Sequence, residues 1–267
     1  GLVKEPPHPP PDVSVRTIDG SYNDLERPAM GSVGTRFGRN VPPKRTFPDS
    51  ERDLLEPNPR VVSRELLTRE HFIPARELNV LAAAWIQFEV HDWFSHQPDE
   101  AAPPFELPLA DDDTWPRRPM EIERTQRDPA SDGREARPAF LTYDSHWWDA
   151  SQIYGSNEKF ANDLRAEDGK LKLDERGLPP KELESNVDLR GVAGNFWVGL
   201  GLLHTLFMHE HNAICDRLRR EYPTWSDDDL YHHARLINAA VMAKIHTVEW
   251  TPAMIAHRTT IKGMHAN

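Results

Sequence analysis

The sequence predicts a mainly α-helical protein whose helices are joined by long irregular connections. Three observations support this prediction. Apolar residues recur at helical spacing over residues 77–94, and the sequence favours helix almost without a break from residue 195 to residue 252. The first seventy residues, in contrast, are rich in Pro and in turn-forming residues. At 267 residues and 38% hydrophobic content, the chain is long enough to bury a substantial core.

Charge and composition exclude several classes of protein. The formal net charge is −11 and no basic cluster offsets it, which argues against a nucleic acid partner. No apolar run approaches the length of a transmembrane segment. The lone Cys215 cannot form an internal disulfide, which fits a reducing compartment. We therefore expect a soluble protein that is cytoplasmic or peripheral to a membrane.

The N-terminal segments predict little regular structure. The stretch "KEPPHPPPD" is typical of polyproline, and turn-forming residues follow it, so residues 1–62 are predicted to form an extended Pro-rich arm. Helical patterns begin near residue 63 and become strong over residues 77–94. Residues 97–140 carry Pro and acidic clusters and are predicted to cross the surface. Alternating Leu and Lys before a Gly-Pro turn predict a small hairpin over residues 168–180.

Two long helices are predicted in the C-terminal third. The first covers about residues 195–221 and ends at "EYPTW". The second begins at a capping pattern between Ser226 and Asp229 and continues to Pro252.

The helix over residues 77–94 carries unusual polar residues for a core element. Gln87 and His91 are four residues apart and therefore share one face, whereas Asp92 is rotated by about 100° towards a different partner. The helix alone leaves two interpretations open: hydrogen-bonded polar groups in a core, or the wall of a site. The first is the commoner arrangement.

A second polar cluster lies in "SHWWDAS". Ser145, Trp147, Asp149 and Ser151 occupy every second position, so an extended loop would turn them to the same side. Hydroxyl, carboxylate and backbone carbonyl oxygens are the hard donors that Ca²⁺ prefers, and Asp92 would supply a second carboxylate. Without Asp92, ordinary turn hydrogen bonds are the better interpretation of this loop.

Four motifs in a fixed order carry a resemblance. "WIQFEVHDW", "HWWDASQIYGSN", "LFMHEHNAICDRL" and "DLYHHARLINAAVMAKIHTVEWT" resemble the animal-type haem peroxidase and cyclooxygenase superfamily, and within it the fatty-acid α-dioxygenases. The similarity runs from "RTIDGSYND" to "IKGMHAN", nearly the whole chain. The resemblance implies an animal haem-peroxidase-like helical fold that is incomplete at the C-terminus. Residues 63–267 would be the N-terminal, distal part of a single catalytic domain.

The resemblance also implies roles for the polar residues. His91 matches the distal histidine above the haem, and Gln87 matches a glutamine in the same pocket, so both are predicted to be catalytic. The family's calcium site would be formed by Asp92, Ser145, the Trp147 carbonyl, Asp149 and Ser151.

The last helix is expected to separate two activities. His246 and Thr251 match a His and a Thr that hold the fatty-acid carboxylate in the α-dioxygenases. A spacing of five places them about 140° apart on a continuous α-helix. They could meet one carboxylate only if the helix ended or bent near Trp250, which Pro252 would favour. Without the resemblance, His246 would be interpreted as a packed core residue.

Departures from the superfamily pattern refine the cofactor prediction. Val90 and, by alignment, Phe196 stand where mammalian peroxidases carry the acidic residues that attach haem covalently, so haem b is predicted to bind non-covalently. No arginine aligns with the catalytic arginine of those enzymes, and Arg190 is the nearest. A pocket without that cation favours an oxygenase over a peroxidase.

The predicted function follows from this resemblance. It is a haem-dependent oxidoreductase that inserts O2 next to the carboxylate of a long-chain fatty acid and yields a 2-hydroperoxy fatty acid. The superfamily's proximal His ligand and radical Tyr lie beyond the "MHAN" segment, so a C-terminal half or a second chain is expected to supply them. His246 as the axial ligand is the less favoured alternative. The alternative functions are a hydrogen-peroxide-dependent peroxidase for small donors and a non-catalytic haem and calcium protein.

Overall fold

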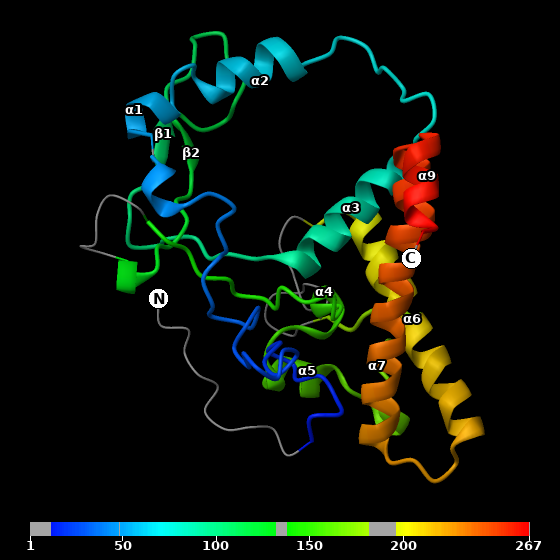
Figure 1. The fold of residues 1–267 in the computed structure, drawn as a ribbon. Helices are drawn as coiled ribbons and strands as arrows, with labels where there is room; N and C mark the ends of the chain where they lie inside the picture. The colour runs from blue at the N-terminus through cyan, green and yellow to red at the C-terminus, as the bar shows by residue number, and fades with distance from the viewer. Residues whose placement is uncertain (1–11, 48, 132–137, 182–195, 267) are drawn as a thin grey trace. The chain divides into compact units, whose positions relative to one another are not determined.

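A computed structural model describes residues 12–47, 49–131, 138–181 and 196–266 (Figure 1). The chain divides into two compact units, which are described separately below. The first comprises Arg36–Arg76 and His96–Leu141, and the second comprises Leu2–Thr35, Glu77–Ser95 and Thr142–Asn267. The predicted boundary after residue 62 falls inside helix α2, Pro59–Leu67, of the first unit. It stays a prediction, since compactness does not reveal which residues form one catalytic domain.

The described part of the first unit contains short elements only. Strand β1 pairs antiparallel with β2, and Leu107 lies opposite Met120 with its side chain buried. Arg60 forms a two-pronged ion pair with Asp113, with both N–O distances at 2.8 Å, and this pair holds the pKa of Asp113 well below its usual range. The elements of this unit are η1 Pro43–Arg45, α1 Glu51–Leu54, α2 Pro59–Leu67, β1 Phe105–Leu107, β2 Met120–Ile122 and η2 Pro129–Ser131.

The second unit is helical, which confirms the predicted fold class. Helices α3, α6 and α7 form its core, and α6 and α7 lie side by side (Figure 1). The rings of Phe88 on α3 and Phe207 on α6 stack with their centroids 5.5 Å apart. The elements are α3 Val80–Trp93, α4 Ser151–Tyr154, α5 Glu158–Leu164, η3 Glu167–Gly169, α6 Val198–Glu221, α7 Asp227–Lys244, η4 Ile245–Trp250, α8 Thr251–Met254 and α9 Arg258–Met264.

The predicted start of α7 is confirmed. The Ser226 hydroxyl accepts a hydrogen bond from the Asp229 backbone N–H at 3.1 Å. The Asp229 carboxylate in turn accepts from the Ser226 N–H at 2.9 Å. This reciprocal capping box satisfies two N–H groups that would otherwise lack partners at the helix terminus.

The predicted hairpin over residues 168–180 is wrong. In the described part of this segment no strand pair extends beyond a single bridge, between Arg165 and Leu171. The reason is a long-range side chain. Asn212 on α6 accepts from the Leu171 N–H at 2.7 Å and donates to its carbonyl at 3.0 Å, so a side-chain amide takes the place of a partner strand.

Among the helices of the described residues, none is both long enough and apolar enough to cross a membrane.

Candidate functional site

Gln87 and His91 lie one turn apart on α3, as their spacing predicts. Both are half-buried, whereas Phe88 and Asp92 on the adjoining face are buried in the core. The indole N–H of Trp197 donates to the Gln87 carboxamide oxygen at 2.8 Å. This bond orients the Gln87 carboxamide, and the pair presents two polar groups on an accessible side of the helix.

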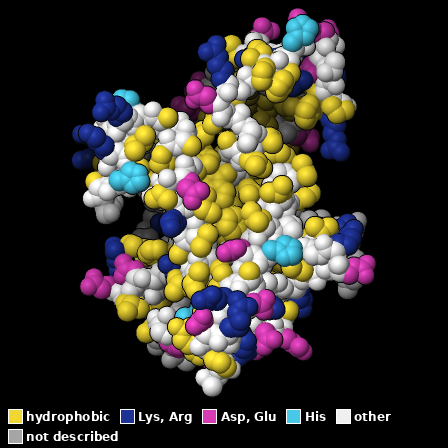
Figure 2. All heavy atoms as spheres, turned by 90° about the vertical axis from the view of Figure 1, so that its right-hand side faces the viewer, with side chains coloured by type: hydrophobic (Ala, Val, Ile, Leu, Met, Phe, Trp, Pro, Cys, Tyr) yellow, Lys and Arg dark blue, Asp and Glu magenta, His cyan; other side chains and the backbone are white. Residues whose placement is uncertain are grey.

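The wall near this pair is apolar and open. Val80 on α3 and Val198, Leu202 and Leu206 on α6 are all exposed, from 50% to 79%. Figure 2 shows hydrophobic side chains gathered on the face that carries α6, α7 and α9. Exposed apolar surface with a few placed polar groups is the chemistry that holds a flat apolar cofactor. These residues therefore fit a haem. Arg190, named in the alignment, lies outside the described residues.

The second predicted cluster is assembled in the interior. Asp92, Ser145, Asp149 and Ser151 are all buried. One Asp92 carboxylate oxygen accepts from the Ser151 N–H at 2.6 Å and from the Ser151 hydroxyl at 3.0 Å. Residues 59 positions apart in the sequence are thus joined, as the calcium-site hypothesis requires.

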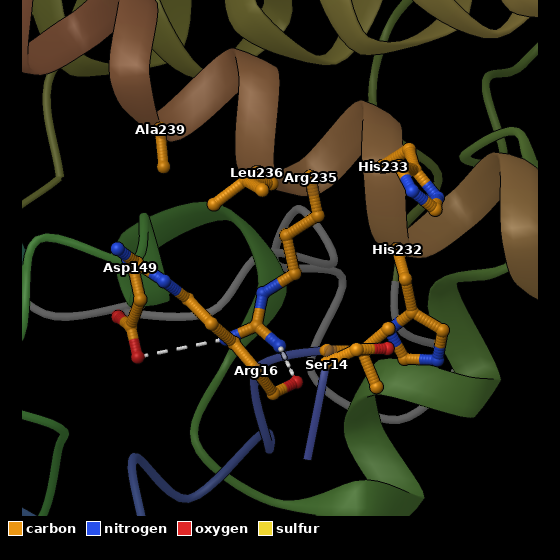
Figure 3. A pocket seen from close by; sticks show the side chains of 9 residues that line it. Ser14, Arg16, Asp149, His232, His233, Arg235, Leu236 and Ala239 are labelled. Atoms are coloured by element: carbon orange, nitrogen blue, oxygen red, sulfur yellow. Dashed lines mark hydrogen bonds and ion pairs between the residues drawn. The ribbon is translucent and has the colours of Figure 1, made fainter. Parts of the chain in front are cut away.

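Asp149 is the residue of this cluster whose carboxylate is least well satisfied by hydrogen bonds from the described residues. Neither of its carboxylate oxygens accepts a hydrogen bond from the described residues. The nearest cation is Arg235 on α7, whose guanidinium nitrogen lies 3.5 Å from the carboxylate (Figure 3). Burial raises the pKa of Asp92 and of Asp149, and the charge of Asp149 raises the pKa of Asp92 further. Two buried carboxyl groups of like charge are what a bound divalent cation would stabilise.

The loop that carries these residues is tightly held. The Ser145 hydroxyl accepts from the Trp147 N–H at 3.1 Å, and the Trp147 carbonyl accepts from the Asp149 N–H at 2.8 Å. Gly20 has φ +78°, and a Cβ atom at Gly20 would lie 2.4 Å from the Ser145 hydroxyl oxygen. Within the described residues no three His, Cys, Asp or Glu side chains are grouped to hold a metal. A cation here would therefore depend on hydroxyl and carbonyl oxygens beside the two carboxylates, which fits Ca²⁺.

His246 and Thr251 share one face of the last long helix, but not for the predicted reason. The helix does not end at Trp250. Instead α7 continues into the π-helical turn η4, and the Thr251 N–H donates to the His246 carbonyl five residues back. Hydrogen bonding from i to i+5 stacks residues that an α-helix would place 140° apart. The Thr251 hydroxyl also donates to the His246 carbonyl, at 2.7 Å.

Aromatic rings surround His246. Trp250 stacks on its ring at 4.9 Å, while Trp93 and Trp148 meet it edge-on at 5.4 and 5.3 Å. The indole N–H of Trp85 donates to Nδ1 of His246 at 3.2 Å. Burial lowers the pKa of His246, so the ring is neutral near pH 7.

Three residues near the site were not identified from the sequence. Trp85 contacts His246, Arg235 faces Asp149, and Glu89 is a buried carboxylic acid on α3. An isolated charge inside an apolar helical stretch was the available signal for Arg235 and Glu89. Trp85 gave no such signal, because a Trp on an apolar helix face is ordinary core.

A family model for animal haem peroxidases matches residues 15–266 of the chain. The chain belongs to the animal haem peroxidase family. Among related members of this family, Alpha-dioxygenase 1 of Capsicum annuum is 39% identical over 260 residues, which are 97% of this chain and 40% of that protein. Alpha-dioxygenase PIOX of Pisum sativum is 39% identical over 263 residues, with the same coverage of both proteins.

Solved structures agree with this family membership. The crystal structure of the Arabidopsis thaliana fatty acid alpha-dioxygenase matches with a TM-score of 0.84 and 38% identity, over 96% of this chain and 40% of that one. An Oryza sativa fatty acid alpha-dioxygenase variant crystallised with palmitic acid matches with a TM-score of 0.83 and 36% identity, over 96% and 42%. The chain therefore spans about 40% of the length of these relatives.

Proposed function

We propose that this chain is the distal-haem part of a fatty-acid α-dioxygenase. The complete protein would be a haem-dependent oxidoreductase that inserts O2 at the carbon next to the carboxylate and yields a 2-hydroperoxy fatty acid. The observation that carries this proposal is the π turn that stacks His246 and Thr251 on one face. The 39% identity to named α-dioxygenases supports it, as against 28% to the Drosophila melanogaster peroxidasin.

The proposed carboxylate site uses two neutral donors. A neutral His246 accepts from Trp85 at Nδ1, so Nε2 carries the hydrogen that a carboxylate can accept. The Thr251 hydroxyl would exchange its bond to the His246 carbonyl for a bond to the same carboxylate. Two donors on one face fix the acid end of the substrate and so determine which carbon reaches the reacting centre.

The proposed distal site lies on α3. Haem b, bound non-covalently, would supply the oxidising centre. His91 would accept and hold a proton there, and Gln87, oriented by Trp197, would donate a hydrogen bond into the same pocket.

A calcium ion is proposed to tie α3 to the loop over residues 145–151. Asp92 and Asp149 would neutralise its charge, and Ser145, Ser151 and the Trp147 carbonyl would complete the set. Because Asp92 follows His91 directly on α3, the ion would restrain the position of the imidazole through the helix backbone.

A further polypeptide is proposed to complete the cavity. The chain spans about 40% of the length of its relatives, and its α6 exposes Val198, Leu202 and Leu206. A C-terminal half or second chain seated there would carry the proximal His ligand and the radical Tyr.

Oxygen uptake with palmitic acid, without added hydrogen peroxide, tests the proposed function in the haem-loaded protein that contains this chain. We expect uptake that His246→Ala and Thr251→Ala each reduce at least about tenfold. Thr247→Ala, on the same turn but exposed, is the control and should keep it. No uptake, together with phenol oxidation once peroxide is added, would identify the peroxidase instead. Absence of both activities in a haem-loaded protein would support a non-catalytic haem carrier.

A further inference from the structure

The hydrogen bond between Trp85 and His246 joins two distant parts of the chain. The donor is on α3, the acceptor is in η4, and the two residues are 161 positions apart. Trp85 is only 6% exposed, and its ring packs against Phe88 and Phe207 at centroid distances of 6.0 and 5.8 Å. The core therefore fixes the direction of the indole N–H before any ligand binds.

This bond determines which hydrogen the imidazole can offer. An indole N–H is a donor only, so Nδ1 of His246 must be the acceptor and cannot carry a hydrogen itself. A neutral ring then has its hydrogen on Nε2. A ring turned by 180° would place a carbon against the indole N–H and leave that donor without a partner in a half-buried site.

The other three tryptophans around His246 hold the ring but do not select its state. Trp250 stacks on its face, and Trp93 and Trp148 contact it edge-on. The Trp93 indole nitrogen has no hydrogen-bond partner in the described part of the chain, although its ring lies as close to His246 as that of Trp148. Three rings therefore shape the surroundings of His246. Among the four tryptophans, Trp85 is the one that donates a hydrogen bond to His246 within the described residues.

We propose that Trp85 is a positioning residue for the substrate: by occupying Nδ1 of His246, it presents the Nε2 hydrogen as a fixed neutral donor to the fatty-acid carboxylate. This inference rests on the proposed carboxylate site. The acid would then be held by hydrogen bonds to neutral groups rather than by a histidinium ion pair at this position.

The test removes the N–H and keeps the shape. In the haem-loaded protein that contains this chain, Trp85 is replaced by β-(3-benzothienyl)alanine, in which sulfur stands in place of the indole N–H. We expect KM for palmitic acid to rise about five- to tenfold while kcat stays within about twofold. The matched control is the same replacement at Trp225, whose ring stacks on Tyr222 and does not contact His246, and it should change neither constant by more than about twofold.

Each outcome decides the proposal. An unchanged KM at position 85 would overturn it, and so would a lower KM, since that would show that the bond hinders a histidinium that binds the acid better. A fall in kcat accompanied by a loss of thermal stability would show that Trp85 acts through packing alone, and this result would also overturn the proposal. His246→Ala separates this proposal from the proposed function. If that variant keeps KM, the carboxylate site itself is wrong, whereas a raised KM in His246→Ala alone rejects only the role of Trp85.

Discussion

Single buried polar residues distinguish the candidate site from an ordinary helical core. Asp149 and Glu89 are fully buried, and none of their carboxylate oxygens has a hydrogen-bond partner among the described residues. Such groups are costly unless a cation or a proton neutralises them. For Asp149 the structure offers an adjacent carboxylate and hydroxyls that suit a cation, whereas Glu89 is best explained as a protonated acid.

Gly20 provides a test of the proposed calcium site that replaces none of its proposed ligands. In Gly20→Ala the new methyl group would lie 2.4 Å from the Ser145 hydroxyl oxygen, so this ligand must shift. Gly34→Ala is the control, because Gly34 has nearly the same φ, +79°, with no heavy atom within 4 Å of its Cβ position. We expect calcium affinity, measured by calorimetry, to fall about tenfold or more in Gly20→Ala only. Equal losses in both variants would attribute the effect to backbone strain.

Glu89 should make stability depend on pH. Burial raises its pKa to about 8, while in the unfolded chain a Glu ionises near 4.3. The folded state therefore holds one more proton between those two values, and the free energy of unfolding decreases as pH rises through that window. Between pH 5 and pH 8 we expect wild type to lose up to about 4 kcal/mol more than Glu89→Gln. Urea unfolding in saturating calcium measures this difference, and parallel pH profiles would show that Glu89 ionises normally.

At the scale of elements, local signals were predictable and long-range ones were not. The capping box at Ser226 and the apolar spacing of α6 and α7 lie within a few residues in the sequence, so the sequence predicts both helices. The hairpin failed because Asn212, forty-one residues away, satisfies the backbone of Leu171. The π turn in η4 likewise inserts one residue into the helix. There is no Gly at that point, and no local sequence pattern predicts the insertion.

The same distinction between local and long-range signals applies to the residues of the candidate site. Spacing and resemblance predict roles for His91, Asp92 and His246, because their motifs are short and contiguous. Trp85 could not be identified, since its role depends on which residue η4 brings to its indole N–H.

Asn212 can be tested as the substitute for a missing strand. Asn212→Ala removes both hydrogen bonds to the Leu171 backbone, at a position where the Leu171 side chain is buried. We expect the free energy of unfolding to fall by about 2 kcal/mol in urea titrations. Glu210→Ala, at an exposed position on the same helix, should change it by less than about 0.5 kcal/mol. A neutral Asn212→Ala would mean that the segment over residues 168–180 is held by its side chains.

At the scale of the whole molecule, the exposed apolar face of α6 is the feature that most requires explanation. Leu202 is 50% exposed next to exposed Val198 and Leu206, on a protein with a net charge of −11. Charge of that size favours solubility, so the exposed apolar strip on α6 supports the proposal that a further polypeptide covers this surface.

Leu202→Glu distinguishes a covered surface from a solvated one. In the chain alone the substitution should leave the free energy of unfolding nearly unchanged and reduce binding of a hydrophobic dye, because the side chain is already in water. In the complete haem-loaded protein a buried, unpaired carboxylate would cost about 2–3 kcal/mol and lower haem retention. Leu66→Glu on α2, where Leu66 is 63% exposed, controls for added charge and should alter neither protein. If Leu202→Glu is equally harmless in the complete protein, α6 faces solvent there, and the further polypeptide must seat elsewhere on the chain.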